Sequence, residues 1–257
     1  MIPSIIHYCW FGGNPLPPLA KECIASWRKF LPDYEIKQWD ESNFDVNIVP
    51  YTAKAYCQKK YAFVSDYARF WIMYHYGGIY FDTDVEVIRP LDDIISNGNF
   101  MGFEIDPDGK NTPGKYAPRY CFGVNPGLGF GVEQAHSLMK KMLNLYATLE
   151  FQPIPQDIAW YKTIVAYTTE TLCKDGLRNK PGIQDVQGIR IYPSEYFAPI
   201  NGITNRLHIT ENTHTIHRYA GSWGNGNTRI KEWIRRLIPE WVLMMNNNIK
   251  RGNYKIR

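Results

Sequence analysis

The segment YGGIYFDTDVE at residues 76–86 constrains this chain more than any other feature. Two glycines precede an apolar run at 79–81, and Asp82 and Asp84 then follow one residue apart. A short apolar run bounded by glycines predicts a buried strand. A carboxylate at the end of a buried strand needs a partner, because an unpaired buried charge is costly. The segment therefore predicts a sheet with a polar site at one edge.

Alternation along a strand over 79–90 would place the carboxylates of Asp82, Asp84 and Glu86 on one face. Carboxylates this close raise one another's pKa unless a cation lies between them. Mg²⁺ and Mn²⁺ prefer oxygen ligands, so a metal site is one interpretation and a solvated strand end is the other. The pattern is weak alone, since a second Asp-x-Asp at 106–108 lies in a Pro/Gly loop and indicates a turn.

Helical and strand-like segments alternate along the rest of the chain, which predicts an α/β fold with a sheet covered by helices. The expected strands are 4–10, 34–40, 79–90, 99–105 and 209–223, and the expected helices are 17–32, 51–78 (one or two helices), 132–150 and 229–245. Residues 106–131 are rich in Gly, Pro and Tyr and are expected to form a loop that serves as a lid.

Composition excludes several classes of protein. The 257 residues are 44% hydrophobic, enough for one large core, and a net charge of +4 is too small to indicate nucleic-acid binding. Five widely spaced cysteines without a CxxC pair argue against a disulfide framework and a cysteine zinc site, and favour a reducing compartment. The N-terminal segment lacks the pattern of a signal peptide, and no apolar run is long enough to span a membrane.

Residues 227–257 are expected to form a separate basic, amphipathic helical extension. Apolar residues recur there at helical spacing beside basic ones: Ile230, Trp233, Ile234, Leu237, Ile238, Trp241 and Val242. Docking of this helix on the body is one interpretation. The other is an interfacial helix that contacts anionic lipid and makes the protein a peripheral membrane protein.

The segment SDYARFWIMYHYGGIYFDTDVEV at 65–87 closely resembles the DXD-motif segment of glycosyltransferase family 32, which includes capsular-polysaccharide sugar transferases and initiating mannosyltransferases. It is also similar to the glucosyltransferase domain of clostridial toxins. The resemblance covers 2–13 and 63–90, and is weaker at 217–223. It implies a GT-A type α/β fold over 1–226, with a Rossmann-like mixed sheet, and a metal-dependent glycosyltransferase that retains anomeric configuration.

The resemblance also assigns residues to the nucleotide-sugar donor. It implies that Trp10 stacks on the base, that Asp66 and Arg69 hydrogen-bond the donor sugar, and that Tyr80 and Asp82 lie at the ribose. From the residues alone, a core aromatic is the favoured interpretation of Trp10. An ordinary ion pair is likewise the favoured interpretation of Asp66 and Arg69, which lie one helical turn apart.

The metal site implied by the resemblance holds Mn²⁺ or Mg²⁺. Asp84 is the expected direct ligand, with Asp82 beside it, and these two aspartates are the expected catalytic residues. In the segment HRYAGSW, His217 is expected to complete the metal shell, and Ser222 and Trp223 to approach the phosphates. A structural histidine is the alternative for His217.

The function expected from these features is transfer of a hexose to a saccharide acceptor in bacterial surface or capsular polysaccharide synthesis. A lipid-linked saccharide is one form that the acceptor could take. A UDP-sugar is the favoured donor because the Trp10 segment resembles uridine-using relatives, with GDP-mannose as the alternative. No residue is assigned as general base, and no nucleic-acid partner is expected. The expected location is the cytoplasm or the inner face of the cell membrane. The rival functions are a non-catalytic glycan-binding module and a glycoside hydrolase, which needs two carboxylates that flank a sugar bond.

Overall fold

The computed structural model describes residues 1–108, 122–152, 163–201 and 204–220. Its strands are β1 (Ile5–Cys9), β2 (Glu35–Trp39), β3 (Gly78–Tyr80), β4 (Val85–Val87), β5 (Asn99–Ile105), β6 (Gly123–Val124), β7 (Phe130–Val132), β8 (Gln184–Val186), β9 (Ile189–Tyr192) and β10 (Thr215–His217). Its helices are α1 (Pro18–Phe30), α2 (Pro50–Cys57), α3 (Tyr61–Tyr76), α4 (Asp92–Ile95), α5 (Ser137–Thr148), α6 (Ile164–Lys174), α7 (Ser194–Phe197) and the 3₁₀ turn η1 (Pro126–Leu128).

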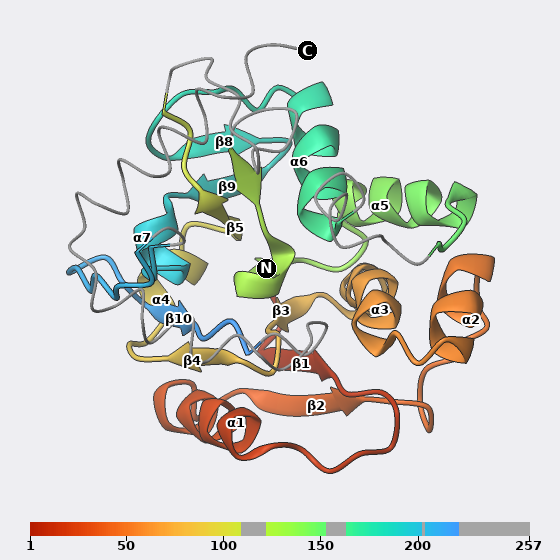
Figure 1. The fold of residues 1–257 in the computed structure, drawn as a ribbon. Coiled ribbons are helices and arrows are strands. Elements are labelled where there is room, and N and C mark those ends of the chain that lie inside the picture. Colours follow the sequence, from red (N-terminus) through yellow and green to blue (C-terminus); the bar gives the residue numbers. More distant parts are fainter. Residues whose placement is uncertain (109–121, 153–162, 202–203, 221–257) are drawn as a thin grey trace.

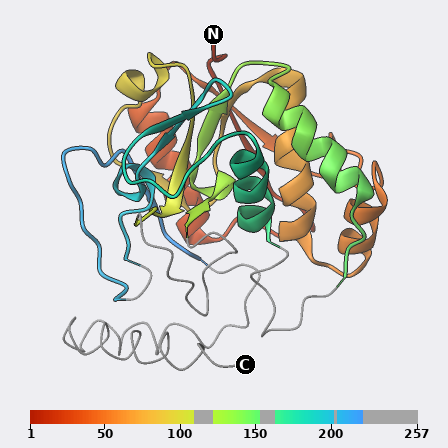
Figure 2. The ribbon, with the colours of Figure 1, turned by 90° about the horizontal axis from the view of Figure 1, so that it is seen from above.

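A mixed sheet forms the centre of the molecule, in the order β2-β1-β3-β7-β5-β9-β8, with β6 paired to β5 (Figure 1). Strands β2, β1 and β3 run parallel, whereas β7 is antiparallel to both β3 and β5. Apolar residues of α2, α3, α5 and α6 form one core cluster with the sheet, and those of α1, α4 and α7 form another. The predicted mixed sheet flanked by helices is confirmed (Figure 2).

The two glycines of the opening segment allow α3 to pass directly into β3. Gly77 ends α3 with a φ of 64°, and Gly78 begins β3 with a φ of 104°, a backbone conformation that other residues rarely adopt. A Cβ atom at Gly78 would also lie only 2.6 Å from the carbonyl oxygen of Ile5 on β1. Glycine is therefore required where β3 enters the sheet beside β1.

The predicted continuous strand over 79–90 is wrong. The chain leaves the central sheet after β3, turns at residues 81–84, and re-forms as β4, which pairs with β10 in a separate two-stranded ribbon. Two backbone hydrogen bonds fix the turn, from Asp82 N to Gly127 O at 3.3 Å and from Val85 N to Asp82 O at 3.0 Å. The strand alternation argument therefore does not place Asp82 and Asp84.

Other sequence predictions are confirmed with changes in extent. The helical stretch at 51–78 is two helices, α2 and α3, and the helix predicted over 132–150 is α5. The loop predicted over 106–131 is wrong for its last part, because β6, η1 and β7 lie there and β7 is an interior strand of the sheet. In the strand predicted over 209–223, only β10 is a strand among the described residues.

Residues 227–257, the predicted helical extension, lie outside the described residues, so its boundary with the body stays a prediction. In the part of the chain that the structure does describe, no helix is long and apolar enough to cross a membrane.

Candidate active site

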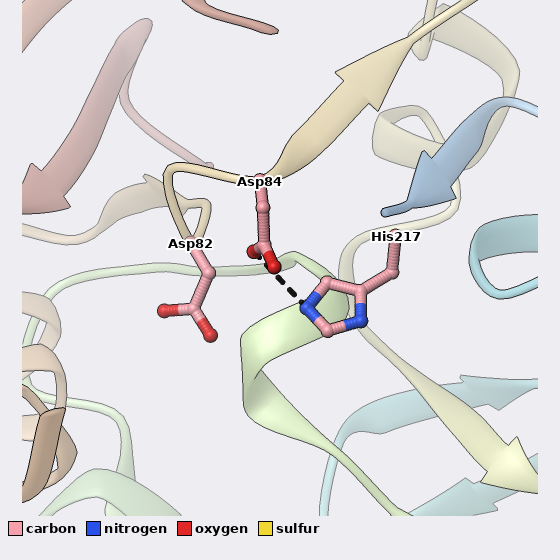
Figure 3. Close-up of side chains that lie close together, drawn as sticks. All are labelled: Asp82, Asp84 and His217. Carbon is pink, nitrogen blue, oxygen red and sulfur yellow. Dashed lines mark ion pairs between the residues drawn. The ribbon is translucent and has the colours of Figure 1, made fainter. Parts of the chain in front are cut away.

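The turn at 81–84 and the ribbon β4–β10 bring three potential ligands together beside the carboxyl ends of β1 and β3. Asp82 lies in the turn, Asp84 directly precedes β4, and His217 is the last residue of β10. Because β10 pairs antiparallel to β4, with His217 opposite Val85, the two segments deliver their side chains to one place (Figure 3). One potential ligand atom from each of the three side chains lies within 4.8 Å of the others.

Asp84 is held tightly by the segment that contains His217. One carboxylate oxygen lies 3.2 Å from Nε2 of His217, and the other accepts a hydrogen bond of 2.8 Å from the backbone N–H of Ala220. The backbone N–H of Arg218 donates to the carbonyl oxygen of Asp84 at 2.9 Å. The ribbon and the chain after it therefore fix both the backbone and the carboxylate of Asp84.

The two aspartates differ in their electrostatic surroundings. Burial raises the pKa of Asp82 and outweighs the opposing effect of Arg69. For Asp84, burial acts in the same direction, but His217 and the Ala220 N–H outweigh it and leave the pKa below its ordinary value. Burial alone would lower the pKa of His217, but the neighbouring Asp84 raises it instead. Asp84 is thus the more strongly stabilised anion.

Arg69 links Asp82 to α3. Its guanidinium lies 3.2 Å from Asp82 and 3.2 Å from Asp66, and its side chain is only 4% exposed. The hydroxyl of Tyr80 donates to Asp82 at 3.3 Å, and the guanidinium of Arg69 lies 4.8 Å from the centre of the Tyr80 ring. Burial raises the pKa of Asp66 to about 7, against the opposing charge of Arg69.

The structure therefore brings together Asp66, Arg69, Tyr80, Asp82, Asp84 and His217 of the residues singled out in the sequence. The ion pair expected between Asp66 and Arg69 is present, and Arg69 also bridges to Asp82. Their predicted contacts to a donor sugar stay predictions. Ser222 and Trp223 lie outside the described residues.

Trp10 directly follows β1 and lies at the edge where β1 and β3 end. Its indole N–H donates to the carbonyl oxygen of Asn14 at 2.6 Å, and its partly buried ring packs against the apolar cluster on the α1 side of the sheet. One part of the ring therefore packs in the core, and the other part is accessible to solvent. The position agrees with a base-stacking role, which stays a prediction.

Glu86, the third carboxylate expected on the strand face, is not part of the cluster. It forms an ion pair with Arg218 on the adjoining segment of the ribbon. Asp106 of the second Asp-x-Asp pattern accepts hydrogen bonds from the backbone and the hydroxyl of Ser194 at the start of α7. Asp106 therefore has a structural role, but in a contact with α7 and not in the local turn expected for it.

Sequence reasoning missed Glu104 and Tyr219, which lie beside the cluster, and interpreted Asn125 only as a turn residue. Asn125 does cap η1, but it also donates to Glu104 at 3.1 Å. Tyr219 stacks edge-on against His217, with ring centres 4.3 Å apart. No local pattern marks these three, because the segments that contain them come together only in the folded chain.

The donor set of the cluster fits a divalent cation. Two carboxylates lie close together, and Nδ1 of His217 is buried with no hydrogen-bond partner among the described residues. Carboxylates suit Mg²⁺ and Mn²⁺, and an imidazole ligand favours a transition ion over Mg²⁺. Asp84, His217 and Asp82 are the residues that could hold it.

Residues 17–101 match the family model described as a glycosyltransferase sugar-binding region containing DXD motif. The matched range begins at α1 and includes Asp66, Arg69 and both aspartates of the cluster. The resemblance seen in the sequence is thereby confirmed over this part of the chain, which is similar to the DXD-motif region of glycosyltransferases.

Three curated fungal relatives match part of the chain. Inositol phosphoceramide mannosyltransferase 1 of Schizosaccharomyces pombe is 26% identical over 150 residues, which cover 54% of this chain and 43% of the relative. Inositol phosphoceramide mannosyltransferase 3 of the same organism is 37% identical over 98 residues, 37% of this chain and 27% of the relative. The initiation-specific alpha-1,6-mannosyltransferase of Candida albicans is 31% identical over 141 residues, which cover 47% of this chain and 37% of the relative. The chain thus spans less than half the length of these relatives.

Two solved glycosyltransferase structures are similar over most of the chain. A glycosyltransferase involved in the glycosylation of the major capsid of PBCV-1 is 12% identical, with a TM-score of 0.48 over 92% of this chain and 100% of that one. The galactosyltransferase LgtC, solved in complex with donor and acceptor sugar analogs, is 14% identical, with a TM-score of 0.41 over 92% of this chain and 98% of that one.

Proposed function

We propose that this chain transfers a hexose from a nucleotide-diphosphate sugar to a saccharide acceptor, with Mn²⁺ or Mg²⁺ bound at Asp84, His217 and Asp82. The observation that carries the proposal is the convergence of these three side chains within 4.8 Å at the edge where β1 and β3 end. Ligands bind at the carboxyl ends of strands in α/β sheets. The two aspartates also lie within the region matched by the DXD glycosyltransferase family.

The bound cation would stabilise the charge of the departing diphosphate. The chain's own residues prepare the site for it. The Ala220 N–H holds the carboxylate of Asp84 in place. Arg69, a residue of α3, does the same for the carboxylate of Asp82. These contacts preorganise the ligands, so little reorganisation is needed when the donor binds. Retention of configuration is part of the proposal, and no residue is assigned as nucleophile or general base.

For the donor, two lines of reasoning point to different nucleotides. The segment around Trp10 resembles uridine-using relatives and favours a UDP-sugar. The curated relatives are named mannosyltransferases, which makes mannose the first sugar to test and GDP-mannose the matching donor. The experiment below separates the two.

The acceptor and the location are also proposed. We infer a saccharide acceptor in the synthesis of surface or capsular polysaccharide or of an oligosaccharide, at the cytoplasmic side of the membrane. Residues 227–257 supply basic and apolar residues for a contact with anionic lipid. Flotation of the full chain and of a truncation at Gly226 with phosphatidylglycerol vesicles tests this contact. Equal flotation of the two would contradict it.

Thermal unfolding in the presence of nucleotides tests the proposed function. The chain is mixed with UDP, GDP, UDP-glucose or GDP-mannose, each with Mn²⁺ and with EDTA. A ligand at one hundred times its Kd adds ~2.7 kcal/mol to the free energy of unfolding, so one nucleotide should raise the midpoint, and only with metal. No shift with any nucleotide would favour a glycan-binding module. A parallel assay of sugar release tests the remaining function, because release without metal would favour a glycoside hydrolase.

A further inference from the structure

Two segments supply the metal ligands, and both lie close to one residue of the central sheet, Glu104. We propose that Glu104 is a positioning residue that sets the spacing of Asp82 and His217, and that Gly127 is the point through which it acts on Asp82. The inference rests on the proposed function, because it concerns the affinity of the same site for a divalent cation.

The connection to Asp82 runs through η1. The side-chain amide of Asn125 donates to Glu104 at 3.1 Å, and its oxygen accepts from the backbone N–H of Gly127 at 2.7 Å. The carbonyl oxygen of Gly127 accepts in turn from the backbone N–H of Asp82 at 3.3 Å. Asn125 is only 8% exposed, so these hydrogen bonds are largely shielded from water. The orientation of one amide therefore determines where η1 meets the turn at 81–84.

Gly127 leaves no room for a side chain between η1 and Asp82. A Cβ atom built there would lie 2.3 Å from Oδ2 of Asp82 and 3.0 Å from Oδ1 of Asn125, much closer than such atoms approach in proteins. Gly127 has no positive φ, so alanine would not strain the backbone. The atom that can move is the end of the Asp82 side chain. Alanine at this position would displace the carboxylate from its place in the cluster.

The connection to His217 runs through Tyr219. The ring of Tyr219 packs edge-on against the imidazole of His217. Burial raises the pKa of the Tyr219 hydroxyl, and the nearby Glu104 carboxylate raises it further. Tyr219 adopts a φ of 48°, a left-handed conformation that is uncommon for residues with a side chain. Its neighbour Ala220 donates to Asp84. Glu104 therefore lies beside the segment that places His217 and the Ala220 N–H, and Tyr219 is the residue that stands between them.

Glu104 itself is well placed to act as a fixed reference. It lies near the end of β5, which pairs with β7 and β9 in the interior of the sheet. Partners that orient metal ligands without touching the metal typically change metal affinity by about 10–100-fold when they are removed. Glu104 would act on two ligands at once, one from each of the segments that the fold brings together.

Calorimetric titration of the full chain with Mn²⁺ alone tests the inference. We expect Glu104→Ala and Gly127→Ala to weaken Mn²⁺ binding by about 10–100-fold. Glu104→Gln keeps an oxygen that can accept from Asn125, so it should recover part of the loss. Tyr219→Phe removes only a hydroxyl from a partly exposed residue and should weaken binding by less, with little effect on thermal unfolding.

Two variants serve as controls. In Gly131→Ala the new Cβ would lie 2.4 Å from the ring of Phe100, so this variant should lose thermal stability but keep the wild-type Mn²⁺ affinity. Glu133→Gln changes an exposed carboxylate at the end of β7 and should alter neither. If Glu104, Gly127 and Tyr219 had only a structural role, their substitution would lower the unfolding midpoint and leave the Mn²⁺ affinity unchanged.

The outcomes separate this inference from the proposed function. If the wild-type chain binds Mn²⁺ but folded Glu104→Ala, Gly127→Ala and Tyr219→Phe bind it equally well, the positioning role is wrong and the proposed function stands. If the wild-type chain binds no Mn²⁺, the metal-dependent function is itself wrong. Should Glu104→Ala fail to fold, Gly127→Ala and Tyr219→Phe still decide the question.

Discussion

Asp84→Asn is expected to abolish the metal-dependent binding of nucleotide and, with it, sugar transfer. Asn has nearly the same volume but no charge, so the site loses the anion that His217 and the Ala220 N–H hold in place. Since loss of a residue that only supports a ligand costs about 10–100-fold in metal affinity, loss of a ligand should cost at least about 100-fold. Calorimetric Mn²⁺ titration and nucleotide release from the sugar donor measure the two effects.

Asp106→Asn is the matched control for Asp84→Asn, because it makes the same change in the other Asp-x-Asp pattern. Asp106 supports the start of α7 through Ser194, so this variant should lose some stability and keep its metal affinity. Full metal-dependent activity in Asp84→Asn would show that the cluster is not the metal site.

Among the variants described, Arg69→Met is expected to lose the most stability, about 3–5 kcal/mol in the free energy of unfolding. Methionine fills a similar space but removes the cation that lies between Asp66 and Asp82. Both carboxylates then lose this positive partner, and Asp66, with a side chain only 12% exposed against 29% for Asp82, is the more shielded from water. Urea unfolding at pH 7 measures the loss.

Two further variants show whether the buried charge is the cause. Arg69→Met combined with Asp66→Asn should be more stable than Arg69→Met alone, because one of the unpaired charges has been removed. Arg190→Met breaks an exposed ion pair with Asp185 at 2.9 Å and should unfold close to the wild-type chain, since solvent screens such pairs. A loss in Arg69→Met no greater than that in Arg190→Met would contradict the account.

The sequence predicts local elements well where their patterns are long. The apolar spacing in α1, the alternation in β2 and the double-glycine end of α3 each depend on residues within one segment. Short strands such as β6 and β7 contain two or three residues and are strands only because β5 and β3 pair with them. No periodicity in their own sequence could mark them, and the same holds for β8 and β9.

Asp82 and Asp84 lie together as the sequence predicts, but the structure corrects the argument that placed them. Strand alternation predicted that Asp82, Asp84 and Glu86 share a face, but a contact with Gly127 breaks the strand and Arg218 pairs with Glu86. Asp82 and Asp84 converge because of a turn, and His217 reaches them through β10. Long-range pairing of this kind can be inferred from a family resemblance, but it cannot be read from residue spacing.

The most direct test of the central claim is a crystal grown with Mn²⁺ and the nucleoside diphosphate that stabilises the chain, examined by anomalous scattering from manganese. The account predicts one strong manganese peak within coordinating distance of the Asp84 carboxylate and the His217 ring, with the diphosphate bound to it. Manganese bound elsewhere, or nucleotide bound with no metal at the cluster, would contradict it.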